Sequence, residues 1–133
     1  MATSTVTYLG NLRTQSVHTQ SGSIIISDAP IDNNGKGEAF SPTDTVANAL
    51  ASCMFTVMGI KARDLEVDFS GSTAQVTKIM GTEPRRIIEI KVHFTMKGTF
   101  DEKTKTILER TAKSCPVLLS LHQDLKKEII FDW

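Results

Sequence analysis

The chain has 133 residues, in which 15 Lys and Arg residues balance 15 Asp and Glu residues. This length suits one domain that buries a core without metal or disulfide support, and we expect a single domain over residues 1–133. The balanced charge, with no basic stripe among aromatics, argues against a nucleic-acid or membrane-surface binder. No basic N-terminal segment precedes an apolar run, and the longest uncharged apolar stretch is too short for a membrane span, so we expect a cytoplasmic protein.

The first third of the chain predicts three short antiparallel strands. Residues 3–10 and 13–19 alternate polar side chains with Thr and Val, and residues 23–27 form a β-branched run. Residues 28–40 are dense in Gly, Asn, Asp and Pro, which predicts a loop before the first helix.

A long helix follows this loop. Ser41 has the side chain of an N-cap, Pro42 suits the first helical position, and Asp44 suits the positive end of the helix dipole. Residues 45–60 carry no charge, which predicts burial on nearly every face of the helix before it ends near residues 61–63. One sheet in so short a chain cannot cover every side, so we expect a homodimer whose two copies meet through this helix about a two-fold axis.

The second half of the chain returns to strands and then to helices. Alternating polar and apolar residues predict strands at residues 65–70, 73–80 and 88–96. Asp101 and Cys115 each precede a predicted helix, ending near residues 114 and 127, and residues 128–133 predict a last strand. The order indicates an α+β fold in which antiparallel sheets pack on the buried central helix.

Only two cysteines are present. Cys53 lies in the middle of the uncharged helix, and Cys115 lies in the segment Ser114-Cys115-Pro116-Val117. In a reducing compartment such a pair is more often catalytic, metal-binding or inert than a permanent bridge. Taken singly, Cys53 could be a small core hydrophobe and Cys115 a helix N-cap. His122 follows Cys115 by two helical turns, but a fourth ligand is missing, so we expect no metal and no cofactor.

These features together resemble the OsmC/Ohr family, which comprises osmotically inducible protein C and the organic hydroperoxide resistance proteins. The resemblance spans essentially the whole chain. It rests on the element order, the helix start at Ser41-Pro42 with an acid nearby, the centre Ala51-Ser52-Cys53 and the second site around Cys115. It implies an intertwined homodimer with active sites at the subunit interface, and a thiol peroxidase that prefers organic hydroperoxides to hydrogen peroxide.

The resemblance also assigns roles to the two cysteines. Cys53 would be the peroxidatic thiol that attacks the peroxide and becomes a sulfenic acid, and Cys115 would be the resolving thiol that condenses with it to a disulfide. A dithiol reductant would then restore both thiols. In the family that reductant is typically a lipoylated protein.

Two further site residues follow from the same resemblance. Arg13 precedes Gly22 by nine residues, a spacing like that of the family's active-site arginine, and its guanidinium would stabilise the thiolate and bind the peroxide. In the Ohr branch a glutamate directly after the helix-start proline orients this arginine. Here Thr43 holds that position, and Asp44 would substitute from the next one.

Two other functions use the same dimer. In one, the pocket binds a small apolar or electrophilic ligand without chemistry and the cysteines stay reduced. In the other, the chain is a structural dimer module with inert thiols. Only the peroxidase requires the two sulfurs to lie close enough to form a bond with little movement.

Overall fold

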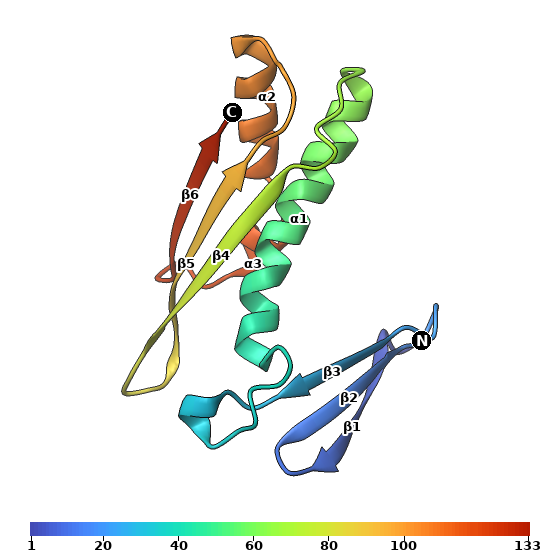
Figure 1. Cartoon of the computed structure of the whole chain (residues 1–133), viewed down its shortest axis with the longest axis vertical. Helices are drawn as coiled ribbons and strands as arrows, with labels where there is room; N and C mark the ends of the chain where they lie inside the picture. Colours follow the sequence, from blue (N-terminus) through green and yellow to red (C-terminus); the bar gives the residue numbers. More distant parts are fainter. The chain divides into compact units, whose positions relative to one another are not determined.

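In the computed structural model, residues 1–133 are described throughout and form two compact units, Met1–Val46 and Ala47–Trp133 (Figure 1). Each unit contains one three-stranded sheet, which with the helices confirms the predicted α+β class. The expectation of one domain over residues 1–133 stays a prediction.

The first unit is built on an antiparallel sheet of β1 (Ser4–Gly10), β2 (Arg13–His18) and β3 (Ile24–Asp28), in that order. These are the three strands expected from the sequence. The turn between β2 and β3 is closed by a hydrogen bond from the Gly22 amide to the His18 carbonyl, 2.8 Å. Gly22 has a φ of +75°, a conformation that favours glycine.

One face of this first sheet exposes large apolar side chains. The strand register places Val6 and Ile25 opposite the same residue of β2, and Tyr8 lies two residues beyond Val6. Their exposed fractions are 61% for Val6, 65% for Tyr8 and 56% for Ile25. A three-stranded sheet with an uncovered apolar face is poorly stable by itself. A short 3-10 helix, η1 (Ile31–Asn33), lies in the loop that follows.

Helix α1 (Pro42–Asp64) starts as the sequence predicts. The Asp44 amide donates to Ser41 Oγ, and the Ser41 amide donates to the Asp44 carboxylate, both at 3.0 Å. This reciprocal pair is a capping box, which satisfies two amides that the helix cannot pair internally. Ser41 is therefore the N-cap.

The burial of α1 differs from the prediction. One face is packed in the core through Ala47, Leu50, Ala51, Met54, Met58 and Ala62. The opposite face is exposed over a stripe with helical spacing, made of Thr45, Asn48, Ser52, Thr56, Ile60 and Arg63. Burial on nearly every face is thus wrong for the single chain, because the chain itself supplies cover for only one side of the helix.

The expectation that no apolar stretch of the chain is long enough to span a membrane is wrong for helix α1. At 23 residues it is long and apolar enough, by length and composition alone, to cross a membrane. The core helix of a soluble protein meets the same criterion. The buried face just described makes α1 the central core helix of the second unit.

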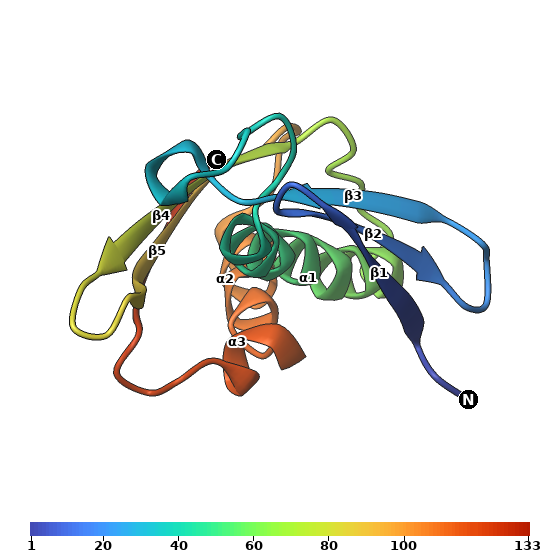
Figure 2. The same cartoon turned by 90° about the horizontal axis from the view of Figure 1, so that it is seen from below.

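The second sheet has the order β4 (Thr73–Gly81), β5 (Arg86–Thr95), β6 (Lys126–Asp132). β4 and β5 are antiparallel, but β6 runs parallel to β5, so the prediction of purely antiparallel sheets is wrong here. The reason is the crossover between them, which contains two helices and returns the chain to the starting end of β5. Buried β5 side chains Ile90, Val92 and Phe94 belong to one core with α1, and the helices lie on one side of β4 and β5 (Figure 2).

The crossover contains α2 (Glu102–Ala112) and α3 (Pro116–Ser120). Asp101 caps α2 as predicted, accepting from the Thr104 amide at 2.7 Å. The predicted extension of α3 to residue 127 is wrong. Leu121 is extended with a ψ of 151°, and the chain then turns where the Asp124 amide donates to His122 Nδ1, 3.0 Å.

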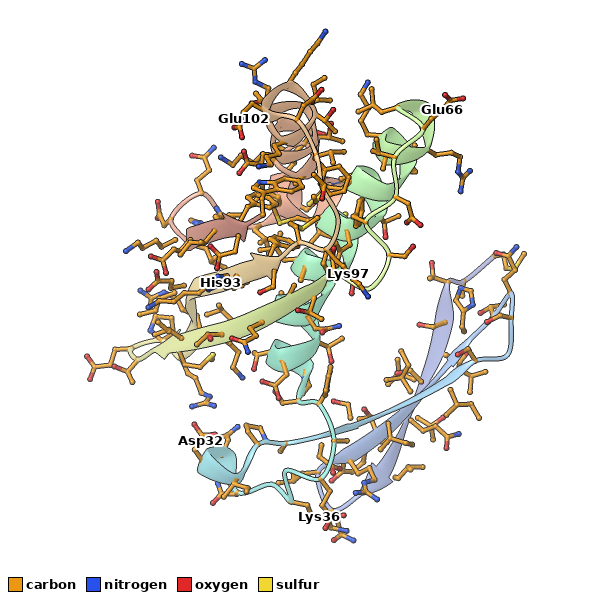
Figure 3. All side chains as sticks on the ribbon, turned by 45° about the horizontal axis from the view of Figure 1, so that its top comes forward. Asp32, Lys36, Glu66, His93, Lys97 and Glu102 are labelled. Atoms are coloured by element: carbon orange, nitrogen blue, oxygen red, sulfur yellow. The ribbon has the colours of Figure 1, made fainter.

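The strand predicted at residues 65–70 is also absent. The Leu65 and Val67 amides donate back to carbonyls of the last turn of α1, at 3.0 and 2.9 Å, so they close the helix instead of pairing with a strand. Glu66, labelled at this end of the helix in Figure 3, has a φ of +56°, which ends the extended backbone that the alternation suggested. The alternation of half-buried and exposed side chains is real, but it occurs in a loop.

Candidate active site

The two cysteines of the second unit are neighbours. Cys53 is on α1 and half-buried, whereas Cys115 is fully buried at 0% exposure, and both are free thiols. Cys53 is near enough to Cys115 to act on the titration of its thiol. The fold therefore makes neighbours of two cysteines that are 62 positions apart in the chain.

The position of Cys115 is set by the start of α3. Cys115 is the N-cap of this helix, with extended backbone, and Pro116 takes the first helical position. Its sulfur accepts a hydrogen bond from the Leu118 amide, 3.3 Å, and its own amide donates to the Ala112 carbonyl, also 3.3 Å. The interpretation of Cys115 as a helix N-cap is thus confirmed.

The surroundings of Cys115 favour its protonated form. Burial raises the pKa of the Cys115 thiol, because a thiolate there would lose its hydration, and the adjacent Cys53 raises the pKa further. The amides of Leu118 and Val117 act in the opposite direction but do not outweigh burial. Cys115 is therefore a neutral thiol at neutral pH.

In the first unit, Arg13 is held by two carboxylates. It lies directly opposite Asp28 in the pairing of β2 and β3. Arg13 Nε and Nη2 donate to the two Asp28 oxygens at 2.7 and 2.9 Å, and Nη2 also donates to Glu38 at 3.2 Å. This two-point geometry fixes the plane of the guanidinium.

The ion pair shifts both titrations in the directions expected for opposite charges. The hydrogen bond from Arg13 holds the pKa of the Asp28 carboxyl below its ordinary value, against the effect of burial, and the pKa of Arg13 is raised by the same bond. The Asp28 side chain is only 1% exposed, whereas Glu38 is 66% exposed. Asp28 is thus the buried anchor of Arg13, and Glu38 is a peripheral partner.

Sequence reasoning missed Asp28, although a signal for it exists. In the β2–β3 hairpin His18 and Ser23 flank the turn, joined by a backbone hydrogen bond of 2.8 Å. Each step away from the turn moves one residue back along β2 and one residue forward along β3, so residue 13 comes to lie opposite residue 28. Asp44 lies instead in the capping box of α1, and the carboxylates that hold Arg13 are Asp28 and Glu38. The catalytic role of Asp44 stays a prediction.

A cavity of about 370 Å³ lies elsewhere in the second unit. Its apolar wall includes Phe55 and Phe69, whose rings stack with centroids 5.9 Å apart, and Arg63 and Asp68 lie on its polar side. The volume is within the range of small-molecule sites. Neither cysteine lines this cavity.

The possible metal ligands do not assemble. No group of three or more His, Cys, Asp or Glu side chains is arranged to hold a metal ion. His122 has a 76% exposed side chain on the loop after α3, where its Nδ1 accepts from the Asp124 amide.

Solved structures with the same fold were found, whereas no curated protein matches the chain. A protein from Psychrobacter arcticus 273-4, described as an osmotic stress induced and detoxification response protein, is 53% identical with a TM-score of 0.96, over 99% of this chain and 96% of that one. An organic hydroperoxide resistance protein OsmC from Legionella pneumophila is 12% identical with a TM-score of 0.76, over 100% and 98% of the two chains. An organic hydroperoxide resistance protein from Elizabethkingia anophelis is also 12% identical, with a TM-score of 0.75 over 99% and 96%.

At 12% identity the last two structures show a common fold and no more. The family is shown by a sequence match that covers more than half of the chain. Residues 35–129, which include both cysteines, match the family model described as OsmC-like protein, and the chain therefore belongs to the OsmC-like family.

Proposed function

We propose that this protein is a thiol peroxidase that reduces organic hydroperoxides to alcohols, with Cys53 as the peroxidatic and Cys115 as the resolving thiol. The observation that carries the proposal is that two free thiols lie near enough for Cys53 to act on the titration of the buried Cys115. Membership of the OsmC-like family supports it. The 53% identical protein from Psychrobacter arcticus, which is described as an osmotic stress induced and detoxification response protein, is consistent with it.

The different exposure of the two thiols supports their order of reaction. A peroxide can reach the half-buried Cys53, whereas Cys115 has no exposed surface. In the first step the Cys53 thiolate attacks one oxygen of the O–O bond. The S–O bond forms, the O–O bond breaks, the alkoxide takes a proton and leaves as the alcohol, and Cys53 becomes a sulfenic acid.

The second step uses the neighbouring thiol. The Cys115 sulfur attacks the Cys53 sulfur, the S–S bond forms, and the S–O bond breaks with release of water. An external dithiol then reduces the disulfide by exchange. In the family this reductant is typically a lipoylated protein, and a reducing cytoplasmic setting suits both the free thiols and such a partner.

Arg13 is the cation that we assign to the Cys53 thiolate. Asp28 occupies the Nε and Nη2 edge of the guanidinium, which leaves Nη1 to donate to a thiolate or to the departing oxygen. Arg13 and the cysteines belong to different units, so this role requires the assembled protein. We assign to Asp28 the orienting of this guanidinium. The orienting role that family resemblance predicts for Asp44 is tested separately.

We also propose that the working protein is a homodimer. The exposed face of α1 is free of charge from Thr45 to Ile60, and the first sheet leaves Val6, Tyr8 and Ile25 uncovered. A second copy of the chain covers such surfaces with a self-complementary contact. The interface then buries apolar area that would otherwise favour aggregation.

The test is consumption of cumene hydroperoxide with dihydrolipoamide as reductant. Cys53→Ser and Cys115→Ser are expected to abolish turnover, while Ser114→Ala, a change at the exposed neighbour of Cys115, is expected to retain it. If the wild-type protein has no turnover and Cys53 is alkylated slowly at neutral pH, the thiol is not activated. The ligand-binding dimer would then replace the peroxidase as the proposed function.

A further inference from the structure

Two charged or polar side chains that the proposed function leaves unused line a second cavity. Its volume is about 500 Å³, and it lies between the β4–β5 hairpin and the loop that joins α3 to β6 (Figure 2). Arg86 lines it from the hairpin and His122 from the loop. Neither cysteine lines this cavity, so it is not part of the candidate active site.

The wall of the cavity between these two side chains is apolar. Ile87 and Ile88 come from the start of β5, and Leu125 comes from the loop. Leu125 is 9% exposed and Ile88 is 37% exposed, so the apolar wall reaches from the core to the surface. Gly81, which pairs with Arg86 on the neighbouring strand, leaves room for this wall, because a Cβ there would lie 2.5 Å from Ile88 Cγ2. The volume and the wall suit the apolar part of a small molecule.

The Arg86 guanidinium is held in place by the hairpin. Nη1 donates to the Thr82 carbonyl at 3.3 Å and to the Pro84 carbonyl at 2.9 Å. These two bonds use both hydrogens of Nη1, and the edge formed by Nε and Nη2 donates to no group of the chain. Two parallel N–H groups on one edge of a guanidinium match the two oxygens of a carboxylate.

The His122 imidazole is also held in place. Nδ1 accepts a hydrogen bond from the Asp124 amide at 3.0 Å, so the hydrogen of the neutral ring is on Nε2, which has no partner in the chain. The His122 carbonyl accepts from the Leu125 amide at 3.1 Å and from Lys127 Nζ at 2.9 Å, which fixes the backbone of the loop. His122 therefore offers one oriented N–H donor.

We propose that this cavity binds a small amphipathic anion, an alkyl chain that ends in a carboxylate. The alkyl chain packs on the apolar wall, and the carboxylate accepts hydrogen bonds from Arg86 and His122. Both side chains have hydrogens that no group of the chain accepts, and with these hydrogens they can only donate, which selects an acceptor and the charge of an anion. This binding function goes beyond the peroxidase and does not depend on it.

One carboxylate also lines the cavity. The Asp124 side chain is 91% exposed, and its carboxylate lies 3.8 Å from His122 Nδ1, the nitrogen that already has a partner. Its charge opposes that of a bound anion, although water weakens the repulsion. Asp124→Asn keeps the amide that holds the imidazole and removes the charge, so it should strengthen the binding of an anion by about twofold. Weaker binding in this variant would indicate a cationic ligand and contradict the proposal.

The main experiment titrates octanoate into the full-length protein by isothermal titration calorimetry, without peroxide. Arg86→Gln removes a charge-assisted two-point contact and should weaken binding by at least about tenfold, and His122→Ala should weaken it by about fivefold. Arg85→Gln is the matched control, because it removes the same charge from the next residue of the hairpin, which does not line the cavity. It should change the affinity by less than about twofold.

Two further probes test the two parts of the ligand. Octan-1-ol lacks the carboxylate and inorganic phosphate lacks the alkyl chain, so each should bind at least about tenfold more weakly than octanoate. The proposal would be overturned by equal affinity of octanoate for the wild type and Arg86→Gln, and equally by the absence of saturable binding to the wild type.

A second measurement locates the ligand and does not require Arg86→Gln to fold. The chain has three histidines, and the signals missing in His122→Ala identify the His122 imidazole in a heteronuclear NMR spectrum. Octanoate should shift the His122 signals and leave those of His18 and His93 in place. Shifts at His18 or His93 without a shift at His122 would place the ligand elsewhere and contradict the proposal.

These measurements separate the inference from the proposed function. Octanoate binding at His122 in a protein without peroxidase turnover would keep the inferred site and remove the peroxidase. Normal turnover in a protein that does not bind octanoate would keep the peroxidase and remove the inferred site.

Discussion

Arg13 and Asp28 lie directly opposite each other on β2 and β3, and two hydrogen bonds of 2.7 and 2.9 Å join the guanidinium to the buried carboxylate. A guanidinium held at two points cannot rotate freely. If it stabilises the Cys53 thiolate, the residue that orients it matters as much as its own charge.

The first prediction concerns this orientation. Asp28→Asn should lower the rate of reaction of Cys53 with an organic hydroperoxide by at least about tenfold, because the amide replaces a charge-assisted bidentate pair with a weaker contact. Glu38→Gln is the matched control, since Glu38 is 66% exposed and contacts Arg13 through one nitrogen. It should change the rate less than about threefold. Stopped-flow measurement of thiol consumption checks both, and equal effects of the two variants would contradict the assignment of Asp28.

The second prediction concerns the pH dependence of stability. The pKa of Asp28 is lowered in the folded protein by its hydrogen bond from Arg13. The stabilisation is therefore fully present above the ordinary Asp pKa of about 3.9, and is lost as the pH falls through the lower folded value. The urea midpoint of Asp28→Asn should lie below that of the wild type at neutral pH and approach it in acid. Asp124→Asn, at a 91% exposed site, should show no such convergence.

The third prediction concerns the capping box of α1. Ser41→Ala and Asp44→Ala each remove one of two reciprocal hydrogen bonds, and each should lower the free energy of unfolding by about 1 kcal/mol. Ser41→Gly should cost only a few tenths of that amount, since glycine is a tolerated N-cap. Peroxide assays on Asp44→Ala also test the catalytic role predicted for Asp44. A loss of rate equal to that of Asp28→Asn would restore Asp44 as an orienting residue.

The fourth prediction concerns the dimer. Thr56 is on the exposed face of α1, and Thr106 is an exposed threonine of α2, and each hydroxyl donates to the carbonyl four residues earlier, at 2.8 and 3.0 Å. Thr56→Lys would bury a charge in the proposed interface, whereas Thr106→Lys would not. Sedimentation velocity should show the first variant as a monomer and the second as a dimer. A dimeric Thr56→Lys protein would move the interface away from this face.

The elements that the sequence predicted well share a local cause. Ser41, Asp101 and Cys115 each mark a helix start because an N-cap is decided by a side chain and the amides next to it. The three strands of the first sheet follow from alternation and turn residues that are close in the chain. For these helix starts and strands, residues close together in the chain were sufficient for the prediction.

The elements that were predicted poorly from the sequence depend on distant parts of the chain. Residues 65–70 alternate like a strand, but no partner strand lies beside them, and their amides return to α1. The direction of β6 depends on how α2 and α3 carry the chain across the sheet. Asp28 was missed as a site residue because its role depends on strand register, although the turn at Gly22 would have supplied that register.

The pairing of Cys53 with Cys115 was expected from family resemblance, and it stays a prediction, although Cys53 acts on the titration of Cys115. Without that resemblance, the sequence did not decide between a catalytic thiol and a small residue packed in the core for Cys53.

The most direct test treats the reduced protein with one equivalent of cumene hydroperoxide and maps its peptides without reduction. We expect a disulfide between Cys53 and Cys115 within one chain, one equivalent of alcohol, and no disulfide when Cys53→Ser is treated in the same way. Both thiols still free after the peroxide is added, or a stable oxidised Cys53 with Cys115 untouched, would contradict the two-cysteine mechanism.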